Sequence, residues 1–486
     1  MSTSTRLQAM RPTDIGVPGP SPLDMARAFR SVRADPLSFL VDVSERFGDL
    51  VAFPVPGAPA LLVNDPADVR RVLQTSARHW GKQTVQYAAL ARVTGPGLLA
   101  SSEPTWIEHR RLAAPAFHHQ RLEAVGDQVR AAADAALTAR LGEDSFATGA
   151  VVDVAALTHR IGLEAVGRAL FSADLSGWAQ QLLDATSEAA ELVVRLGRSV
   201  LPTATWAPTP TNLRLRSARR RLDSISAELI AERRARGRRS AAGSHGDDLL
   251  GLLLDSDLTD GEIRHELVTM VIAGHETVAA ALAWTLMLLA EHQPAQDRVR
   301  AELAGHPGPV PMLGHRDSLP WTRAVVDEAL RLFPPAWALS RRSLRADVIG
   351  GHAVPPGTMV IVSPWLLHRR GDSWPDPLAF RPERFLGAGT GGGASTGGGA
   401  STGAGRSGYL PFGQGPRLCI GREFALGEMV VVLSRLLAAY RVGVPPGWSR
   451  PAAQAQVAVH PRGGMPLVVT RLPALTITGA DHDRGR

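Results

Sequence analysis

Apolar residues recur at three- and four-residue intervals along most of the chain, from about Glu103 to Leu339. That spacing places them on one face of a helix and predicts a largely helical fold. Shorter apolar runs lie outside this region, in VAFPVPG and PALLVND near the start and again in residues 347–364. Because such runs are typical of strands, we expect a mainly α protein with a minor β region.

The longest apolar run is LVTMVIAGHETVAAALAWTLMLLA, residues 267–290. Thr259 and Glu262 precede it at the spacing of a capping box, so a helix is predicted to begin there and to continue to about His292. The run is apolar enough to raise the question of a membrane span. However, His275 and Glu276 lie near its middle, where a bilayer penalises polar groups. We therefore expect a long buried helix with a polar interruption.

The order of the predicted elements indicates one structural core. We expect an N-terminal extension over residues 1–35, a single domain over residues 36–472 and a C-terminal tail over residues 473–486. Residues 387–405 repeat GGGAST and cannot build a core, which predicts a flexible surface insertion without a catalytic role. The first twenty residues have neither a signal-peptide core nor a membrane span, so a cytoplasmic protein is expected.

The formal net charge is +7, and its distribution is uneven. Ten arginines fall between Arg214 and Arg239, and their spacing predicts the solvated outer face of one or two helices. WAPTPTN, residues 206–212, is predicted to be an exposed loop before this run. We expect no nucleic-acid binding, because neither aromatic residues nor a known nucleic-acid-binding fold accompanies the charge. Contact with anionic lipid or an acidic partner protein is the alternative function.

The chain has a single cysteine, which lies in the glycine-rich stretch FGQGPRLCIG, residues 412–421. An amphipathic run follows directly, so Cys419 is predicted to lie at or just before a helix N-terminus, where a thiolate is favoured. A lone cysteine is more often a small buried hydrophobic residue. A zinc site is not expected without a second cysteine or paired histidines, and no local histidine supports a cysteine hydrolase. The turn suits a thiolate ligand of haem iron.

This stretch resembles the haem-binding loop of the cytochrome P450 family, F-x-x-G-x-R-x-C-x-G. Phe412, Gly415, Arg417, Cys419 and Gly421 match the signature without a gap. The resemblance implies haem b with Cys419 as the axial iron ligand and with Phe412 and Arg417 in the cofactor site. It also implies a single cytochrome P450 domain in which the haem lies between the long central helix and the helix after the cysteine loop.

A second motif is AGHET, residues 273–277, in the middle of the long helix. Taken alone, it predicts a local bulge at Gly274 or a threonine that bonds back to a carbonyl of the preceding turn. The stretch is similar to the oxygen-activation motif of the P450 family. By that resemblance Thr277 and Glu276 are catalytic: Thr277 would hydrogen-bond dioxygen at the cofactor, and Glu276 would help to relay protons through water.

Arginines at three places in the sequence resemble the family's ligands for the haem propionates. Trp106 and Arg110 are four residues apart and match W-x-x-x-R, and Arg417 and Arg341 complete the set. A guanidinium suits a carboxylate because it offers paired donors in a fixed fork. Two further assignments are weaker: Arg342 could take the place of Arg341, and His109 could lie near the propionates. Three other residues match a structural network of the family, namely Glu328, Arg331 and Arg384.

The resemblance implies a monooxygenase of the soluble bacterial type. No flavin or ferredoxin module is fused to the chain, so electrons are expected from a separate ferredoxin and ferredoxin reductase, or from a flavodoxin. A basic surface formed by Arg406, Arg417 and Arg422 would suit an acidic ferredoxin. Three alternatives stay open: a haem sensor without turnover, and a peroxygenase or an isomerase on the same scaffold. Glu276 and Thr277 favour the monooxygenase, because the alternatives need no oxygen activation.

Several segments also resemble the bacterial subgroup that hydroxylates carotenoid rings, among them KQTVQYAALARVTGPGLLA, AGHETVAAALAW and PPAWALSRR. This likeness favours a large apolar isoprenoid as the substrate, with fatty acids, steroids and other natural products as alternatives. Residues 82–100 and 185–215 are expected to line its pocket. WAPTPTN beside the arginine-rich helix could allow peripheral contact with a membrane from which the substrate is collected.

Overall fold

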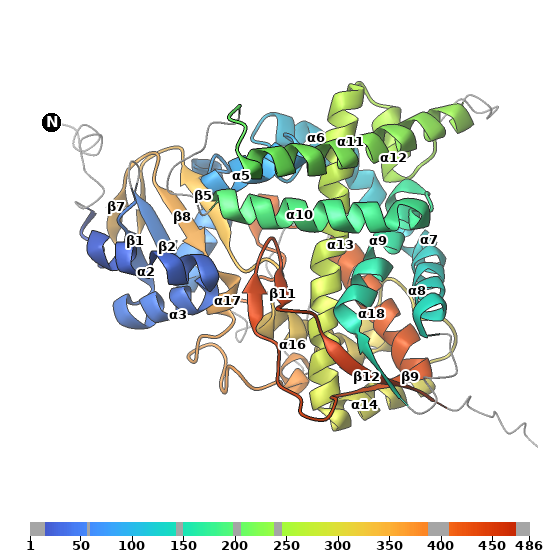
Figure 1. The fold of residues 1–486 in the computed structure, drawn as a ribbon. Helices are drawn as coiled ribbons and strands as arrows, with labels where there is room; N and C mark the ends of the chain where they lie inside the picture. The colour runs from blue at the N-terminus through green and yellow to red at the C-terminus, as the bar shows by residue number, and fades with distance from the viewer. Residues whose placement is uncertain are drawn as a thin grey trace, which may run out of the picture.

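The computed structural model describes residues 15–55, 59–141, 149–197, 206–237, 245–386 and 408–472. The predicted insertion 387–405, the predicted tail 473–486 and Arg406 lie outside these residues. In the described part, most helices pack around one long central helix, and the largest sheet lies to one side of them (Figure 1). The expectation of a mainly α fold with a minor β region is confirmed.

The helices have the following bounds: α2 Pro22–Ala34, α3 Pro36–Phe47, α4 Pro66–Arg70, α5 Val85–Thr94, α6 Thr105–Ala113, α7 His119–Ala124, α8 Gly126–Leu141, α9 Val154–Phe171, α10 Ala179–Gly197, α11 Pro210–Gly237, α12 Leu249–Leu254, α13 Asp260–Glu291, α14 Gln293–Ala304, α15 His315–Ser318, α16 Pro320–Leu332, α17 Pro364–Leu367 and α18 Arg422–Ala439. A π-helical turn, Arg71–Thr75, continues α4. Because α11 begins at Pro210, the loop predicted at 206–212 is shorter than expected, and the described part of the arginine run forms one helix.

The strands form four small sheets. The largest joins β1 Leu50–Phe53, β2 Ala60–Val63, β8 Met359–Val362, β5 Leu339–Ser343 and β3 Trp80–Gly81 in that order. A second sheet has the order β4 Ala150–Asp153, β12 Pro466–Arg471 and β9 Tyr440–Gly443, and the hairpins pair β6 Asp347–Ile349 with β7 His352–Val354 and β10 Ala453–Ala455 with β11 Val459–Pro461. The strands predicted in both apolar regions are therefore present.

Helix α13 runs through the middle of the molecule (Figure 1). It begins with the predicted capping box, in which Thr259 and Glu262 bond to each other's backbone N–H, and it ends at Glu291. Among the described residues it is the one helix long and apolar enough to cross a membrane, but 83% of its most apolar window is buried in the fold. The prediction of a long buried helix is confirmed. The predicted bulge at Gly274 is wrong, because the helix is α-helical throughout.

Two glycines let α13 pack closely against α9. A Cβ atom on Gly274 would lie 2.8 Å from a methyl group of Val166, and one on Gly162 would lie 3.1 Å from the carbonyl oxygen of His275. Larger residues at these positions would push the helices apart, because non-bonded carbon atoms prefer about 3.5–4.0 Å. Close packing fixes the part of α13 that carries the AGHET motif.

A buried ion-pair network joins α16 to the segment that leads to the cysteine loop. Arg331 is fully buried and donates to Glu328 through two bonds of 2.7 Å. It also donates to the carbonyls of His368 and Pro377, at 2.8 and 2.7 Å. Arg384 completes the predicted trio with a 3.3 Å bond to Glu328. The buried charges are thus paired and hydrogen-bonded, as buried charges need to be.

Candidate haem site

Cys419 lies in a tight turn that ends at the N-terminus of α18. Gly421 is the N-cap residue of the helix, and the Cys419 N–H donates to the Phe412 carbonyl at 3.0 Å. Gly415 has a φ of +74°, and a Cβ atom there would lie 1.9 Å from the Leu73 carbonyl oxygen. Only glycine fits such a position. The predicted placement of the cysteine just before a helix is confirmed.

The thiol of Cys419 is exposed, yet the protein packed around the turn raises its pKa above the usual value by desolvation. Exposure and desolvation are compatible, because the side chain is open to solvent on one side and enclosed by protein on the others. A bond from the Gly421 N–H lowers the pKa, as do the charges of Arg110, Arg422 and Lys82, but their effect is smaller. The helix N-terminus alone was expected to favour the thiolate. The Gly421 N–H at the helix end does favour the thiolate, but desolvation has the larger effect in the protein by itself.

Four cationic side chains gather near Cys419. Arg417 stacks on the Trp106 ring, with its guanidinium carbon 3.8 Å from the ring centroid, and Arg110 lies over the same ring at 5.6 Å. Lys82 and Arg341 are near enough for the charge of Arg341 to lower the pKa of both Lys82 and Arg417. The predicted residues Trp106, Arg110, Arg341 and Arg417 are therefore brought together by α6, β5 and the cysteine loop.

The backbone of β5 separates Arg341 from its neighbour Arg342. Arg341 is buried and Arg342 is exposed, because successive side chains of a strand point to opposite faces. Arg341 belongs to the cation cluster, whereas the Arg342 guanidinium lies near Gly357. The structure therefore places Arg341, rather than Arg342, beside the other cations, and its contact with a propionate stays a prediction.

Lys82 is a member of the cluster that the sequence prediction missed. It is buried, donates to the Leu99 carbonyl at 2.8 Å and lies 4.5 Å from the Tyr87 ring centroid. Burial lowers its pKa well below the usual value, and the charges of Arg341, Arg417 and Arg110 lower it further. A buried lysine is rare unless it is paired, but nothing in its local sequence marks it.

The four cations form no ion pair within the described part of the chain, although Glu103 lies near enough to raise the pKa of Arg417. Burial lowers the pKa of Arg417 to about 10 and that of Arg110 by less. A cation cluster in which two members are buried and two are half-buried, without a paired carboxylate, is unfavourable by itself and fits a ligand that carries negative charge. The Nδ1 of His109 is bonded at 2.6 Å to the buried carboxylate of Glu266, and its place near the propionates stays a prediction.

Thr277 and Glu276 lie on neighbouring positions of α13. The Thr277 hydroxyl is half-buried and donates to the Ala273 carbonyl at 2.8 Å, the back-bonding that the sequence left open as the structural alternative. Glu276 is buried, and its Oε2 has no hydrogen-bond partner among the described residues. Desolvation raises the pKa of Glu276 to about 8, so its carboxyl group is mostly protonated at neutral pH.

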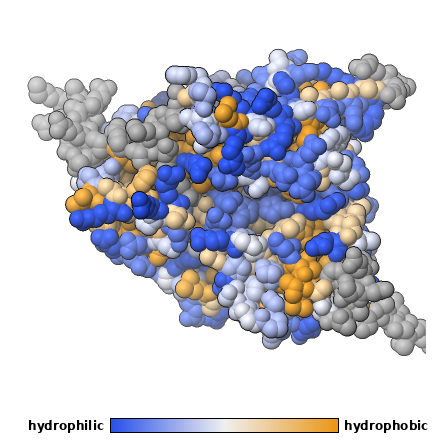
Figure 2. Space-filling view, in the orientation of Figure 1, coloured by the Kyte–Doolittle hydropathy of each residue, from blue (hydrophilic) through white to orange (hydrophobic). Residues whose placement is uncertain are grey.

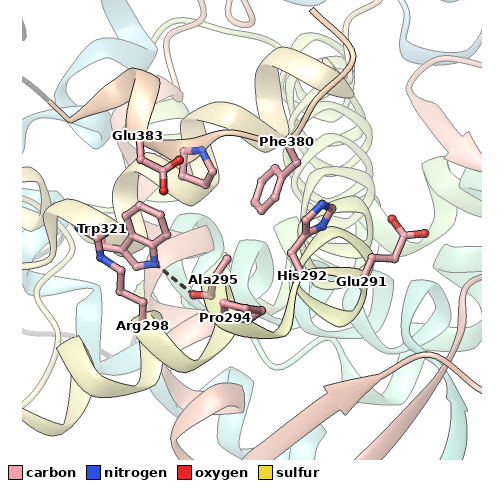
Figure 3. Close-up of a pocket in the computed structure, with 9 residues that line it drawn as sticks. Glu291, His292, Pro294, Ala295, Arg298, Trp321, Phe380 and Glu383 are labelled. Atoms are coloured by element: carbon pink, nitrogen blue, oxygen red, sulfur yellow. Dashed lines mark hydrogen bonds between the residues drawn. The ribbon is translucent and has the colours of Figure 1, made fainter. Parts of the chain in front are cut away.

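A separate groove opens at the C-terminal end of α13 (Figure 3). It has a volume of about 400 Å³ and is lined by residues from α13, α14, α16 and segment 380–383, including His292, Trp321 and Phe380. Arg298 lies over the Trp321 ring at 3.7 Å. None of the predicted site residues lines this groove, so the chemistry does not belong there.

Comparison with known proteins identifies the family. A family model described as cytochrome P450 matches residues 17–468. This chain belongs to the cytochrome P450 family. Cyclooctat-9-en-7-ol 5-monooxygenase of Streptomyces melanosporofaciens is 32% identical, over 85% of this chain and 86% of the relative. Pentalenene oxygenase of Streptomyces avermitilis is also 32% identical, over 92% of this chain and 95% of the relative.

Two further matches come from other organisms. The protein LUTEIN DEFICIENT 5 of Arabidopsis thaliana is 28% identical, over 87% of this chain and 73% of its own length. The crystal structure of CYP175A1 from Thermus thermophilus matches with a TM-score of 0.71 and 30% identity, over 93% of this chain and all of that chain. The P450 fold predicted from the motifs is confirmed, and the chain is an oxidoreductase of the monooxygenase class.

Proteins of this family use haem b with a cysteine thiolate ligand, and Cys419 is the only cysteine in the chain. The donor set described above fits this group. It offers one sulfur ligand at the N-terminus of α18 and a cluster of cations that can neutralise two propionates. Iron coordination would also replace the thiol proton, which desolvation of Cys419 otherwise favours.

Proposed function

We propose that this P450 hydroxylates a large apolar isoprenoid, either a carotenoid or a cyclic terpene, with dioxygen and electrons from separate redox proteins. The relatives support this substrate class, because one is named for cyclooctatenol, another for pentalenene and a third for lutein. These names describe hydrocarbon skeletons or their alcohols that are built from isoprene units and carry little charge. The segments that resembled carotenoid-ring hydroxylases point to the same class.

The observation that carries the assignment of the site is the cation cluster beside Cys419. When bound, haem b supplies the redox chemistry that places one atom of dioxygen into a C–H bond and releases the other as water. Cys419 would hold the iron. The two haem propionates would be bound, and the orientation of the haem fixed, by Lys82, Arg110, Arg341 and Arg417. Phe412 begins the cysteine loop, is half-buried against the main hydrophobic core and would shield the sulfur from water.

Thr277 and Glu276, on α13, would hold and donate protons on the side of the site away from the cysteine loop. Glu276 keeps a proton at neutral pH because it is buried, so it can donate one without first taking it up. The Thr277 hydroxyl already donates to Ala273, and a rotation about its Cα–Cβ bond would redirect the same proton toward the site. Both groups therefore hold protons near the reacting atoms in a region from which most solvent is excluded.

The substrate would bind beneath α10 and α11. Helix α5, within the predicted segment 82–100, packs against α10, α11 and α13, and α10 and α11 cross over α13 in Figure 1. Ala273 on α13 is half-buried and small, which leaves room for a bulky skeleton. An apolar ligand gains about 25 cal/mol for each Å² that it buries in such surroundings.

The redox partner would dock near the cysteine loop in the cytoplasm. Of the three arginines expected on this surface, Arg422 is exposed and pairs with Glu423. Arg417 is half-buried and stacks on Trp106, so it does not belong to the surface as expected. Arg406 lies outside the described residues. A ferredoxin with its reductase, or a flavodoxin, would therefore meet a less basic patch than the sequence predicted.

Peripheral membrane contact is a separate part of the proposal. Trp206 is 78% exposed in the turn before α11, as an interfacial anchor should be. However, Figure 2 shows a mainly hydrophilic face over α10 and α11, and most described arginines of α11 pair with carboxylates. These pairs include Arg214 with Glu188, Arg219 with Asp223 and Arg234 with Asp260. Flotation with anionic vesicles tests the contact, and Trp206→Ser should abolish any binding observed.

The substrate class is tested with the holoprotein by titrating a carotenoid, a cyclic diterpene, a sesquiterpene, a fatty acid and a steroid. An apolar ligand that displaces water from ferric haem changes its absorption spectrum, and only an isoprenoid should do so at micromolar concentration. Incubation with labelled dioxygen and redox proteins should then place one labelled atom in the product. Binding of fatty acids or steroids alone would overturn the substrate class without affecting the assignment of a monooxygenase.

The role of Thr277 is tested with Thr277→Ala and a matched control on the same helix. Thr285 donates to the Ala281 carbonyl at 2.7 Å in the same way, but it lies two turns further along α13. Both variants lose one hydroxyl, so both should fold and bind haem. Thr277→Ala should consume electrons with little product, whereas Thr285→Ala should stay coupled. Equal coupling in the two variants would contradict the role of Thr277.

A further inference from the structure

Three histidines surround Glu276 on the side where α9 and the β10–β11 hairpin meet α13. The Nε2 of His460, on β11, lies 3.9 Å from Glu276 Oε1. The His460 ring stacks on His159 of α9, with ring centroids 5.3 Å apart and planes 25° apart. His275, the neighbour of Glu276 on α13, contacts the edge of His159 at 5.8 Å. No group of residues in the described part of the chain has the geometry of a metal site.

The two ends of this cluster differ in their exposure. Glu276 and His275 are buried, and His159 and His460 are half-buried. Ala156, one turn before His159 on α9, and Arg160, the next residue, are both exposed. The His159 ring therefore lies at the margin of the outer face of this helix. The cluster therefore extends from the protein surface to the carboxyl group that the site needs to protonate.

Two atoms in the cluster are buried without a hydrogen-bond partner in the described residues. They are Oε2 of Glu276 and Nε2 of His460. Buried polar atoms are rarely left in this state, and such exceptions are often tied to function. The 3.9 Å gap is too long for a hydrogen bond, and a movement of about 1 Å or a single bridging water would close it. His275 is different, because its Nδ1 donates to the Val271 carbonyl at 2.6 Å.

We propose that His460 and His159 form the path by which protons from solvent reach Glu276. The proposal rests on the proposed function, in which Glu276 gives up a proton on every turnover. Glu276 releases its carboxyl proton toward the site and becomes a carboxylate. It then takes the proton from Nε2 of His460, whose Nδ1 accepts one from water or from His159. Each cycle moves one proton inward, and no oxidation or reduction takes place in the path.

The protonation states of the cluster suit this transfer. Desolvation lowers the pKa of His159, His275 and His460 to about 4 each, so all three are neutral at neutral pH. A neutral imidazole carries one donor and one acceptor, and it can take a proton on one nitrogen while it releases another. The charged group that faces the cluster is Asp153, the N-cap residue of α9, which raises the pKa of His159 slightly against desolvation.

A direct test measures how fast the Glu276 proton exchanges with solvent in the resting holoprotein. Rapid transfer into heavy water shifts the infrared carbonyl band of a protonated carboxyl group, and Glu276→Gln identifies the band. His460→Phe keeps an aromatic ring for stacking but removes both nitrogens, and it should slow the exchange by at least about tenfold. His159→Phe should slow it by less, because water can reach His460 when the outer imidazole is lost.

Turnover gives a second, independent measurement. Oxygen consumption driven by ferredoxin and its reductase should fall about tenfold in His460→Phe and show a larger solvent isotope effect. Peroxide-driven oxidation of guaiacol should stay within about twofold, since peroxide brings its own protons and electrons. His292→Phe is the matched control, because His292 is a half-buried histidine at the far end of α13 and should leave all three readings unchanged.

The outcomes separate the two proposals. Exchange and oxygen consumption that match the wild type in His460→Phe would overturn the proton path and leave the monooxygenase intact. A wild-type protein that shows no oxygen consumption would overturn the proposed function, and the infrared exchange would still test the path. If His460→Phe fails to fold, His460→Gln and His159→Phe take its place with the same expected direction.

Discussion

Glu276→Gln tests the electrostatics of the site through the stability of the protein. Glu276 is fully enclosed by protein, and its pKa is about 8 compared with 4.5 for an ordinary glutamate. The folded protein therefore holds this proton up to about pH 8, whereas the unfolded chain releases it near pH 4.5. Because the folded state binds more protons in this window, the free energy of unfolding of the wild type must fall as the pH rises through it.

The magnitude follows from the pKa difference. Each pKa unit is worth about 1.4 kcal/mol, so ionisation of Glu276 lowers the wild-type stability by roughly 3–4 kcal/mol between pH 5 and pH 8. Glutamine does not titrate, and Glu276→Gln lacks this slope. The variant should therefore become more stable relative to the wild type by that amount across the window. Below about pH 5 the two proteins should differ by little beyond the change from a carboxyl group to an amide.

The assay is urea unfolding of both holoproteins at several pH values, followed by far-UV circular dichroism. Glu45→Gln on α3 is the control, since Glu45 is an exposed glutamate and its substitution should add no slope. A difference between Glu276→Gln and the wild type that stays constant from pH 5 to pH 8 would refute the argument. It would mean that Glu276 ionises in the folded protein as freely as in water.

Two further predictions concern charges around the haem site. Arg341→Leu should weaken retention of haem by about ten- to hundredfold, as judged by transfer to apomyoglobin, because one carboxylate loses a charged donor worth about 1.5–3 kcal/mol. The same substitution at the exposed neighbour, Arg342→Leu, should have little effect. Equal haem loss in both variants would contradict the assignment of Arg341, rather than Arg342, to the propionate. Arg331→Met should destabilise the fold by about 3–5 kcal/mol, because it leaves the Glu328 carboxylate buried without its main partner. Thermal unfolding of the variant close to that of the wild type would contradict this value.

The elements that could be predicted from the sequence are those fixed by local patterns. The capping box at Thr259 and the apolar run behind it determine where α13 begins and that it is buried. The cysteine loop could be predicted because Gly415 has to accept the Leu73 carbonyl oxygen against its backbone, which no other residue allows. The capping box acts within a few residues of its motif, whereas Leu73 is distant from Gly415 in the sequence and only the glycine in the loop signature marks that contact.

The remaining features depend on contacts between distant segments. Lys82 joins the cations near Cys419 only because β3 pairs with β5, and its own sequence carries no sign of burial. The histidines near Glu276 come from α9 and β11, which are about three hundred residues apart in the sequence, so no local pattern links them. The surface role expected for Arg417 was wrong because the Trp106 ring holds its side chain inside. The desolvation of Cys419 could not be predicted, because it comes from protein packed around the turn and not from the helix terminus.

The central claim is that Cys419 ligates haem iron through its thiolate. The absorption spectrum of the dithionite-reduced protein with carbon monoxide, recorded beside Cys419→Ser, tests it most directly. We expect a strongly red-shifted Soret band in the wild type, because a thiolate donates electron density to the iron, and we expect that band to be absent from the variant. A wild-type band typical of histidine-ligated haem, or no haem at all, would contradict the account.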